Sequence, residues 1–179
     1  SNLNGPVAVR GCSRTGEPYS VSGRGPTITN TVAGATTFAL TTVNNVVIEG
    51  LNMEGSTSTG AHVLIDGGAG SSAAHRVWIK NNTMLGKDNG VKLTRTVYQA
   101  YVQGNMISVS NAEGIFLDYV GAAAQTSIHI EKNWIRGTSG DGINAAGAAG
   151  GVNIVIRGNQ VSDISAANIS HTLHDTQTR

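Results

Sequence analysis

Three carboxylates in the second half of the chain stand where they could act together as an acid and a base. Glu113 and Asp141 each lie directly before a glycine that opens an apolar run, and Asp118 ends the run that follows Gly114. Hydrolysis of a glycosidic bond uses two carboxyl groups about 5 to 9.5 Å apart, one protonated and one ionised. Glu113, Asp118 and Asp141 are therefore the candidate catalytic residues. Acidic residues before glycine are also ordinary turn residues, so a structural role stays open.

Lys92 and His62 indicate a second chemistry, β-elimination. A lyase needs a base that removes the proton next to a carboxylate, and a cation that neutralises this carboxylate. Lys92 and His62 occupy the same predicted strand position, and Arg95 follows closely. The sequence has no acidic cluster that resembles a calcium site, so we expect no metal and no cofactor. Calcium would be required only if the chemistry is that of a lyase.

These residues fall within an internal repeat. In each copy the first, third and eighth residues are apolar, and the sixth residue is Asn in four copies and Leu51 in the other. The five copies are VVIEGLNM (46–53), VWIKNNTM (77–84), AYVQGNMI (100–107), IHIEKNWI (128–135) and IVIRGNQV (154–161). A second apolar motif follows each copy, beginning at Gly60, Gly90, Gly114, Gly142 and Asn168.

The alternation of apolar and polar residues within each copy predicts short β-strands. One unit cannot bury its inner face alone, so we expect stacked coils about 4.8 Å apart that form parallel sheets. The sixth-position Asn tolerates a left-handed backbone at a tight bend. Stacked in register, its amide can also bond to the coils above and below as a ladder. The predicted fold is an all-β solenoid of about six to seven coils.

Outward-facing columns of side chains follow from this register. On the first strand of each unit they are Val47, Trp78, Tyr101, His129 and Val155, and next to them Glu49, Lys80, Gln103, Glu131 and Arg157. On the second strand they are His62, Lys92, Phe116, Asn144 and Ser170, and then Leu64, Thr94, Asp118, Ala146 and Thr172. Thr59, Asn89, Glu113, Asp141 and Ala167 lie just before the second strand. We expect the charged column to be a solvated face.

Trp78, Tyr101 and His129 form an aromatic stripe on three consecutive predicted coils. Such a stripe can be a platform for sugar rings, a buried interface between subunits, or a surface covered by a loop such as residues 67–75. These three alternatives stay open. The predicted substrate-binding residues are Trp78, Tyr101, His129, Lys92 and Phe116.

The repeated pattern GIxL…IxxNxI resembles the right-handed parallel β-helix of the pectate-lyase-like superfamily, over roughly residues 46–172. The resemblance implies a single-stranded right-handed parallel β-helix as one domain over residues 1–179. Within it we expect irregular coils over 1–45, regular repeats over 46–172 and a tail over 173–179. An antiparallel β-sandwich is the alternative, although it would not repeat a bend Asn in register. Six to seven coils is short for this family, and the sequence shows no amphipathic capping helix at either end. We therefore expect a piece of a longer chain, or a subunit whose ends are covered by partners.

The stretch SGDGIN (139–144) is similar to the NTDGID stretch of polygalacturonase-type hydrolases. Asn144 stands where that family has its next Asp, and the sequence contains no Asp-Asp pair, no Gly-His-Gly and no Arg-Ile-Lys. We therefore do not transfer the catalytic set of that family to this chain.

Composition excludes several other classes. The chain has 12 basic and 11 acidic residues, so nothing in its charge predicts binding to nucleic acid or to an anionic membrane. It has no apolar run long enough for membrane insertion. Cys12 is the only cysteine, which excludes a disulfide framework and a CxxC metal site. We expect Cys12 to be a small buried filler.

Two classes of function remain. The first is recognition of a polysaccharide, with or without depolymerisation by a hydrolase or a lyase. The resemblance then implies a phage tailspike or a secreted or surface glycan enzyme, located outside the cell, on its surface or on a virion. It also implies a homo-oligomer, which would be a trimer in a phage-type spike. The second class is a non-catalytic structural or adhesive module of a larger surface protein. The missing catalytic motif and the small Gly, Ala and Ser loops favour this second class.

Overall fold

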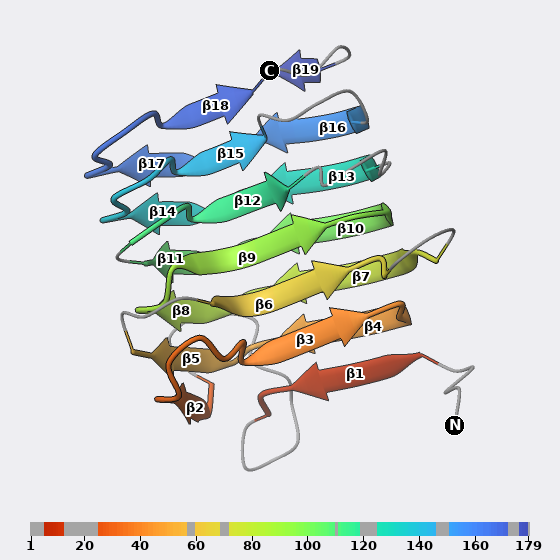
Figure 1. Ribbon diagram of the computed structural model, residues 1–179, viewed down its shortest axis with the longest axis horizontal. Helices are drawn as coiled ribbons and strands as arrows, with labels where there is room; N and C mark the ends of the chain where they lie inside the picture. The colour runs from red at the N-terminus through yellow and green to blue at the C-terminus, as the bar shows by residue number, and fades with distance from the viewer. Residues whose placement is uncertain are drawn as a thin grey trace.

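The structure is a computed structural model that describes residues 6–12, 25–56, 60–68, 72–109, 111–118, 125–145, 151–171 and 176–178. These ranges hold β-strands and no helix. Each circuit of the chain adds one strand to each of three parallel sheets, so that the coils stack from the N-terminal to the C-terminal end (Figure 1). Coil 1 holds β1–β3, coil 2 holds β4–β6, and the sequence continues in this way to coil 6, which holds β16–β18.

The three sheets are numbered in the order in which a coil enters them. Sheet 1 consists of β1 (Val7–Arg10), β4 (Asn44–Glu49), β7 (Ala74–Lys80), β10 (Val97–Gln103), β13 (Gln125–Glu131), β16 (Gly151–Arg157) and β19 (Thr176–Thr178). Sheet 2 consists of β2 (Thr27–Asn30), β5 (Asn52–Gly55), β8 (Thr83–Leu85), β11 (Met106–Ser108), β14 (Trp134–Arg136) and β17 (Gln160–Ser162). Sheet 3 consists of β3 (Phe38–Thr41), β6 (Ala61–Asp66), β9 (Asn89–Thr94), β12 (Ile115–Asp118), β15 (Ile143–Ala145) and β18 (Ile169–His171).

The predicted parallel solenoid is confirmed. Every pairing between the described strands is parallel, which excludes the antiparallel sandwich. Within residues 1–45, β2 and β3 already join sheets 2 and 3. Thr176–Thr178, which the sequence analysis assigns to a tail, pair with β16. Cys12 is exposed, so the prediction of a buried filler is wrong.

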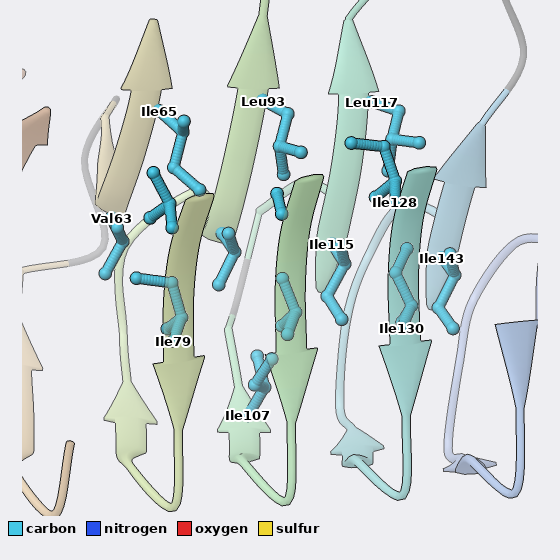
Figure 2. Close-up of a cluster of buried hydrophobic side chains, with 14 of the residues drawn as sticks. Val63, Ile65, Ile79, Leu93, Ile107, Ile115, Leu117, Ile128, Ile130 and Ile143 are labelled. Carbon is cyan, nitrogen blue, oxygen red and sulfur yellow. The ribbon is translucent and has the colours of Figure 1, made fainter. Parts of the chain in front are cut away.

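Alternation along each strand builds one core between the sheets. In β13, Ile128 and Ile130 are fully buried, whereas His129 between them is half-buried and faces outward. The same alternation in sheet 3 buries Ile115 and Leu117. Figure 2 shows these aliphatic side chains converging between the sheets. Burial of this stack is the main driving force for coil formation.

The predicted amide ladder is confirmed at the corner between sheets 1 and 2. Asn105 Oδ1 accepts hydrogen bonds from the backbone N (3.0 Å) and Nδ2 (3.1 Å) of Asn82 in the preceding coil. Asn105 Nδ2 donates to Asn133 Oδ1 in the next coil and to the Ile79 carbonyl, each at 2.9 Å. Asn133 repeats this pattern in full. At the two ends of the ladder, Asn82 Oδ1 accepts from the Leu51 N–H, and Asn159 Nδ2 donates to the Ile130 carbonyl.

The left-handed backbone lies one position earlier than predicted. Positive φ occurs at the fifth repeat position and not at the ladder Asn, because the chain must bend just before the amide turns inward. The φ angles are 70° at Gly50, 56° at Asn81, 64° at Gly104, 56° at Lys132 and 63° at Gly158. This conformation strains residues other than glycine, and Asn tolerates it best.

The predicted outward columns of sheet 1 are confirmed, but those of sheet 3 need a correction at coil 2. The pairing of β6 with β9 sets Leu64 beside Lys92 and Asp66 beside Thr94. The prediction that His62 and Leu64 hold these places is wrong by two residues, because the chain enters β6 two residues later than Gly60 indicates. Thr59, Ala146 and Thr172 lie outside the described residues.

His62 is therefore an interior residue. Its side chain is fully buried, and its Nε2 lies 2.9 Å from the Leu85 carbonyl oxygen. Burial lowers the pKa of His62 from 6.5 to about 4, the contact with Leu85 partly opposes this shift, and the nearby Lys87 ammonium adds to it. The ring is thus neutral in the folded protein under neutral conditions.

Lys87 is a second buried polar residue in the same corner. Its side chain is fully buried and crosses coil 2, and its Nζ donates to the carbonyl oxygens of Ala35 (2.8 Å) and Val32 (3.2 Å) in coil 1. The lysine stem fills the space in which a Cβ on Gly55 would lie, 2.5 Å from two of its carbons. Glycine at residue 55 therefore makes room for a lysine that links coil 3 to coil 1.

Asn133→Ala should lower the free energy of unfolding by roughly 1–3 kcal/mol, because it removes a buried amide and leaves the Asn105 N–H without its acceptor. Denaturant unfolding of this variant and of Asn44→Ala, an exposed Asn in β4, provides the comparison. A loss within about 0.5 kcal/mol for Asn133→Ala, as for an exposed site, would contradict the role of the ladder.

His62 should make the fold sensitive to mild acid. Because its folded pKa, about 4, lies below the unfolded value of 6.5, stability is complete above pH 6.5 and falls as the pH drops towards 4. The loss should reach about 3 kcal/mol at most. Unfolding of His62→Gln measured across this window should show a flatter pH profile than the parent. A steeper or unchanged profile would contradict the assignment, and His75→Gln, on the outer face of sheet 1, is the matched control.

Candidate functional site

The outer face of sheet 3 brings together three residues that the sequence analysis selected. Lys92 lies beside Phe116 on the next coil, and Asp118 lies beside Thr94. Lys92 Nζ is 2.8 Å from Asp118 Oδ2 and 5.0 Å from the centre of the Phe116 ring. The lysine is thus engaged as a cation by a carboxylate and by a ring face. These two contacts hold the Lys92 side chain in place between Asp118 and Phe116.

A groove of about 360 Å³ runs along this face beside Lys92. It is lined by Thr36, Gly60, Ala61, Leu64, Asp88, Asn89, Lys92 and Thr94, which come from coils 1, 2 and 3. Its volume falls within the range of small-molecule sites. The sequence analysis missed Asp88, because this residue belongs to neither repeated motif. Its place directly before Asn89 in the turn was the available signal.

Arg95 and Asp66 form a second ion pair. Asp66 is the last residue of β6, and Arg95 directly follows β9. Arg95 Nη1 lies 3.1 Å from Asp66 Oδ2 and 3.3 Å from Asp66 Oδ1. The pair is partly exposed, so its contribution to stability is small. The Asp66 carboxylate balances the charge of the Arg95 guanidinium, a residue that the sequence analysis placed near the candidate lyase base Lys92.

The three candidate acids do not form one cluster. Glu113 and Asp141 occupy the same turn position on neighbouring coils, since Gly114 N donates to the Asp141 carbonyl oxygen at 3.1 Å. Asp141 Oδ1 accepts a hydrogen bond of 2.9 Å from the Ala167 N–H, so one of its oxygens caps the next coil. Asp118 lies five residues beyond Glu113, about 16 Å along an extended strand, which is too far for a glycosidase pair.

The aromatic stripe on sheet 1 is a stack of rings. The ring centres of Trp78 and Tyr101 are 5.5 Å apart with planes 5° from parallel, and those of Tyr101 and His129 are 4.9 Å apart at 17°. All three side chains are half-buried. Because each ring covers part of the next ring's face, the stack offers ring edges and partial faces to a ligand.

The charged column beside this stack is solvated at its cations, as expected, but its two glutamates are covered. Glu49 binds Arg10 and Lys80, and Glu131 binds Arg157 and His129. The side chains of Glu49 and Glu131 are only 9% exposed, because the longer cations fold over them. A depression of about 210 Å³ adjoins this column and is lined by Lys80, Asn81, Gln103, Gly104, Glu131 and Lys132.

Trp134 is an exposed aromatic residue that the sequence analysis did not select. It lies on the outer face of sheet 2 with 39% of its surface exposed, and the Arg136 guanidinium lies 4.9 Å from its ring centre. Its place one residue before the inward Ile135 was the available signal, because alternation turns that position outward.

Metal binding and membrane insertion find no support in the described part of the chain. Among the described residues, no three His, Cys, Asp or Glu side chains gather as a metal site. The same residues include no helix with the length and apolar character needed to cross a membrane.

The comparisons with known proteins agree with the architecture. No curated protein matches the sequence. A family model described as a right-handed β-helix region matches residues 9–178, which is nearly the full length given. Together with the three stacked parallel sheets, this match shows that the chain belongs to the right-handed β-helix family.

Proposed function

We propose that this β-helix recognises a polysaccharide through the groove on sheet 3, without cleaving it. The observation that carries the proposal is the groove beside Lys92, which combines an apolar wall at Leu64 with the hydroxyl, amide and charged groups of Thr94, Asn89 and Asp88. A sugar presents C–H groups and hydroxyl groups side by side, so it needs such a mixed surface. Stacked coils extend this surface along the axis, which suits a chain-like ligand.

The contacts of the candidate catalytic residues support binding without cleavage. Asp118 is held by Lys92, and Asp141 caps the next coil through Oδ1. A catalytic pair needs two carboxyl groups at a defined distance, one of them able to donate a proton. The contacts of Asp118 and Asp141 give each of these carboxylates a structural role instead.

The test is binding of the purified chain to a panel of neutral, acidic and amino polysaccharides by affinity electrophoresis. Leu64→Ser should weaken binding of the best ligand about fivefold, or about 1 kcal/mol, because it removes apolar contact area from the groove. Leu85→Ser makes the same change at an outward leucine on sheet 2 and should leave binding unchanged. Equal affinities for the two variants would contradict a site on sheet 3.

The same samples test for cleavage, with and without calcium. We expect neither new reducing ends nor ultraviolet absorbance of unsaturated uronates. New ends without absorbance would indicate a hydrolase and would contradict the non-catalytic proposal, with Glu113 and Asp141 as the residues to replace. Both signals together would indicate a lyase.

A second candidate function, a structural or adhesive module, is favoured by the ring stack on sheet 1. The half-buried edges of Trp78, Tyr101 and His129 form a ridge of the kind that interfaces use. If this ridge packs against another subunit, Trp78→Ala should shift the mass measured by sedimentation towards the monomer while glycan binding stays unchanged. A loss of glycan binding at constant mass would assign the ridge to the sugar. No change in either would exclude both roles.

A further inference from the structure

The charges of the described residues are distributed unevenly over the three sheets. In the described part of the chain, sheet 1 and the bends that follow its strands hold five cations and two carboxylates, a surplus of three positive charges. The cations are Arg10, Arg76, Lys80, Lys132 and Arg157, and the carboxylates are Glu49 and Glu131. The strands of sheet 2 carry one charge of each sign, at Glu54 and Arg136.

Sheet 3 and the turns that adjoin it have the opposite surplus. Their described residues include six carboxylates and three cations, a surplus of three negative charges. The carboxylates are Asp66, Asp88, Glu113, Asp118, Asp141 and Asp163, and the cations are Lys87, Lys92 and Arg95. Lys87 is buried and donates to the carbonyl oxygens of Val32 and Ala35, so its charge lies away from the surface.

The two charged sheets face in opposite directions. Inward side chains of sheet 1, such as Ile79, and of sheet 3, such as Leu93, meet in the core between the sheets (Figure 2). The outer faces of these sheets therefore lie on opposite sides of the solenoid, one basic and the other acidic. Two copies of the chain can bring these unlike faces together with a favourable charge interaction, whereas two like faces repel each other.

Each of the two faces also has apolar side chains among its charges. On sheet 1, Trp78 of the ring stack lies between Arg76 and Lys80 along β7. On sheet 3, Leu64 lies two residues before Asp66 along β6. Because both faces repeat with the coil spacing of about 4.8 Å, their columns of side chains can align. Apolar contacts surrounded by charged groups are the usual composition of a protein interface.

We infer that copies of this chain associate face to back, with the outer face of sheet 1 in one copy against the outer face of sheet 3 in the next. Such an interface is heterologous, so every assembly that does not close into a ring keeps one basic and one acidic face free and grows with concentration. The inference goes beyond the proposed function and does not rest on it, because the association requires no glycan.

Sedimentation velocity of the full chain, over a range of concentrations and at two salt levels, tests the association. At about 0.02 M salt the mean mass should rise with protein concentration. At about 0.5 M salt it should fall to the mass of the monomer, because the Debye length drops from roughly 20 Å to roughly 4 Å. A chain that stays monomeric at every concentration in low salt would overturn the inference and would leave the basic face to an anionic partner.

Charge reversals on one face at a time test which faces meet. The sheet 1 variant combines Arg76→Glu with Lys132→Glu, at two exposed cations. The sheet 3 variant combines Asp88→Lys with Glu113→Lys. Each variant has two faces of the same sign, so its association in low salt should be weaker by about tenfold or more. Glu54→Lys, on sheet 2, changes the net charge in the same direction as the sheet 3 variant and should leave association unchanged.

A mixture of the two variants completes the test. The unchanged acidic face of the sheet 1 variant can meet the unchanged basic face of the sheet 3 variant. The mixture should therefore associate although neither variant does so alone, which also shows that both are folded. If the sheet 3 variant alone associates as strongly as the parent, sheet 1 packs against itself and the inference is overturned. A mixture that stays monomeric, with both variants folded by thermal unfolding, or an equal loss of association in Glu54→Lys, would also overturn it.

Discussion

The side-chain amides between sheets 1 and 2 are the interaction on which the rest of the structure depends. At this corner the chain turns within two residues, such as Gly104 and Asn105, and no strand pairing can continue through the bend. The buried Asn133 uses its full capacity there, accepting two hydrogen bonds and donating two. Because the bonds run to the coils on both sides, they set the height of each coil relative to its neighbours. From coil 2 to coil 6, where these bonds run, they hold the parallel pairing of the three sheets at that common height.

The fixed height of each coil also determines which side chains become neighbours on the surface. Equivalent positions of successive coils lie next to one another, so a surface column is composed of one side chain per coil. Rings then meet rings, as in Trp78 and Tyr101, and opposite charges meet across neighbouring coils, as in Glu49 and Lys80. Recognition sites on such a protein extend along the axis, and a single substitution alters one step of a longer surface.

The sequence could predict the fold, the ladder and the aromatic stripe, because all three depend on residues that recur at the same place in each unit. It could not place the left-handed bend, since Gly, Asn and Lys share that conformation and differ in type. His62 was assigned to the surface because Gly60 imitates the glycine that opens the second strand elsewhere. The burial of Glu49 and Glu131 depends on how far Arg10, Lys80 and Arg157 fold back, which alternation alone does not determine. The groove could not be predicted either, because its walls combine residues of three coils with Asp88, which lies in a turn outside the repeated motifs.

Lys87 has a consequence for how a solenoid of this kind can change its length. The amide ladder is the same in coils 3 to 6, so a unit could be gained or lost there while each remaining Asn bonds to a new neighbour. Lys87 instead spans the height of two coils, and its ammonium reaches the carbonyls of coil 1 only because a single coil with glycine at residue 55 lies between. An extra unit inserted there would strand a buried positive charge away from its acceptors. Duplication or deletion of coils is therefore open to the C-terminal side of coil 3 and closed between coils 1 and 3.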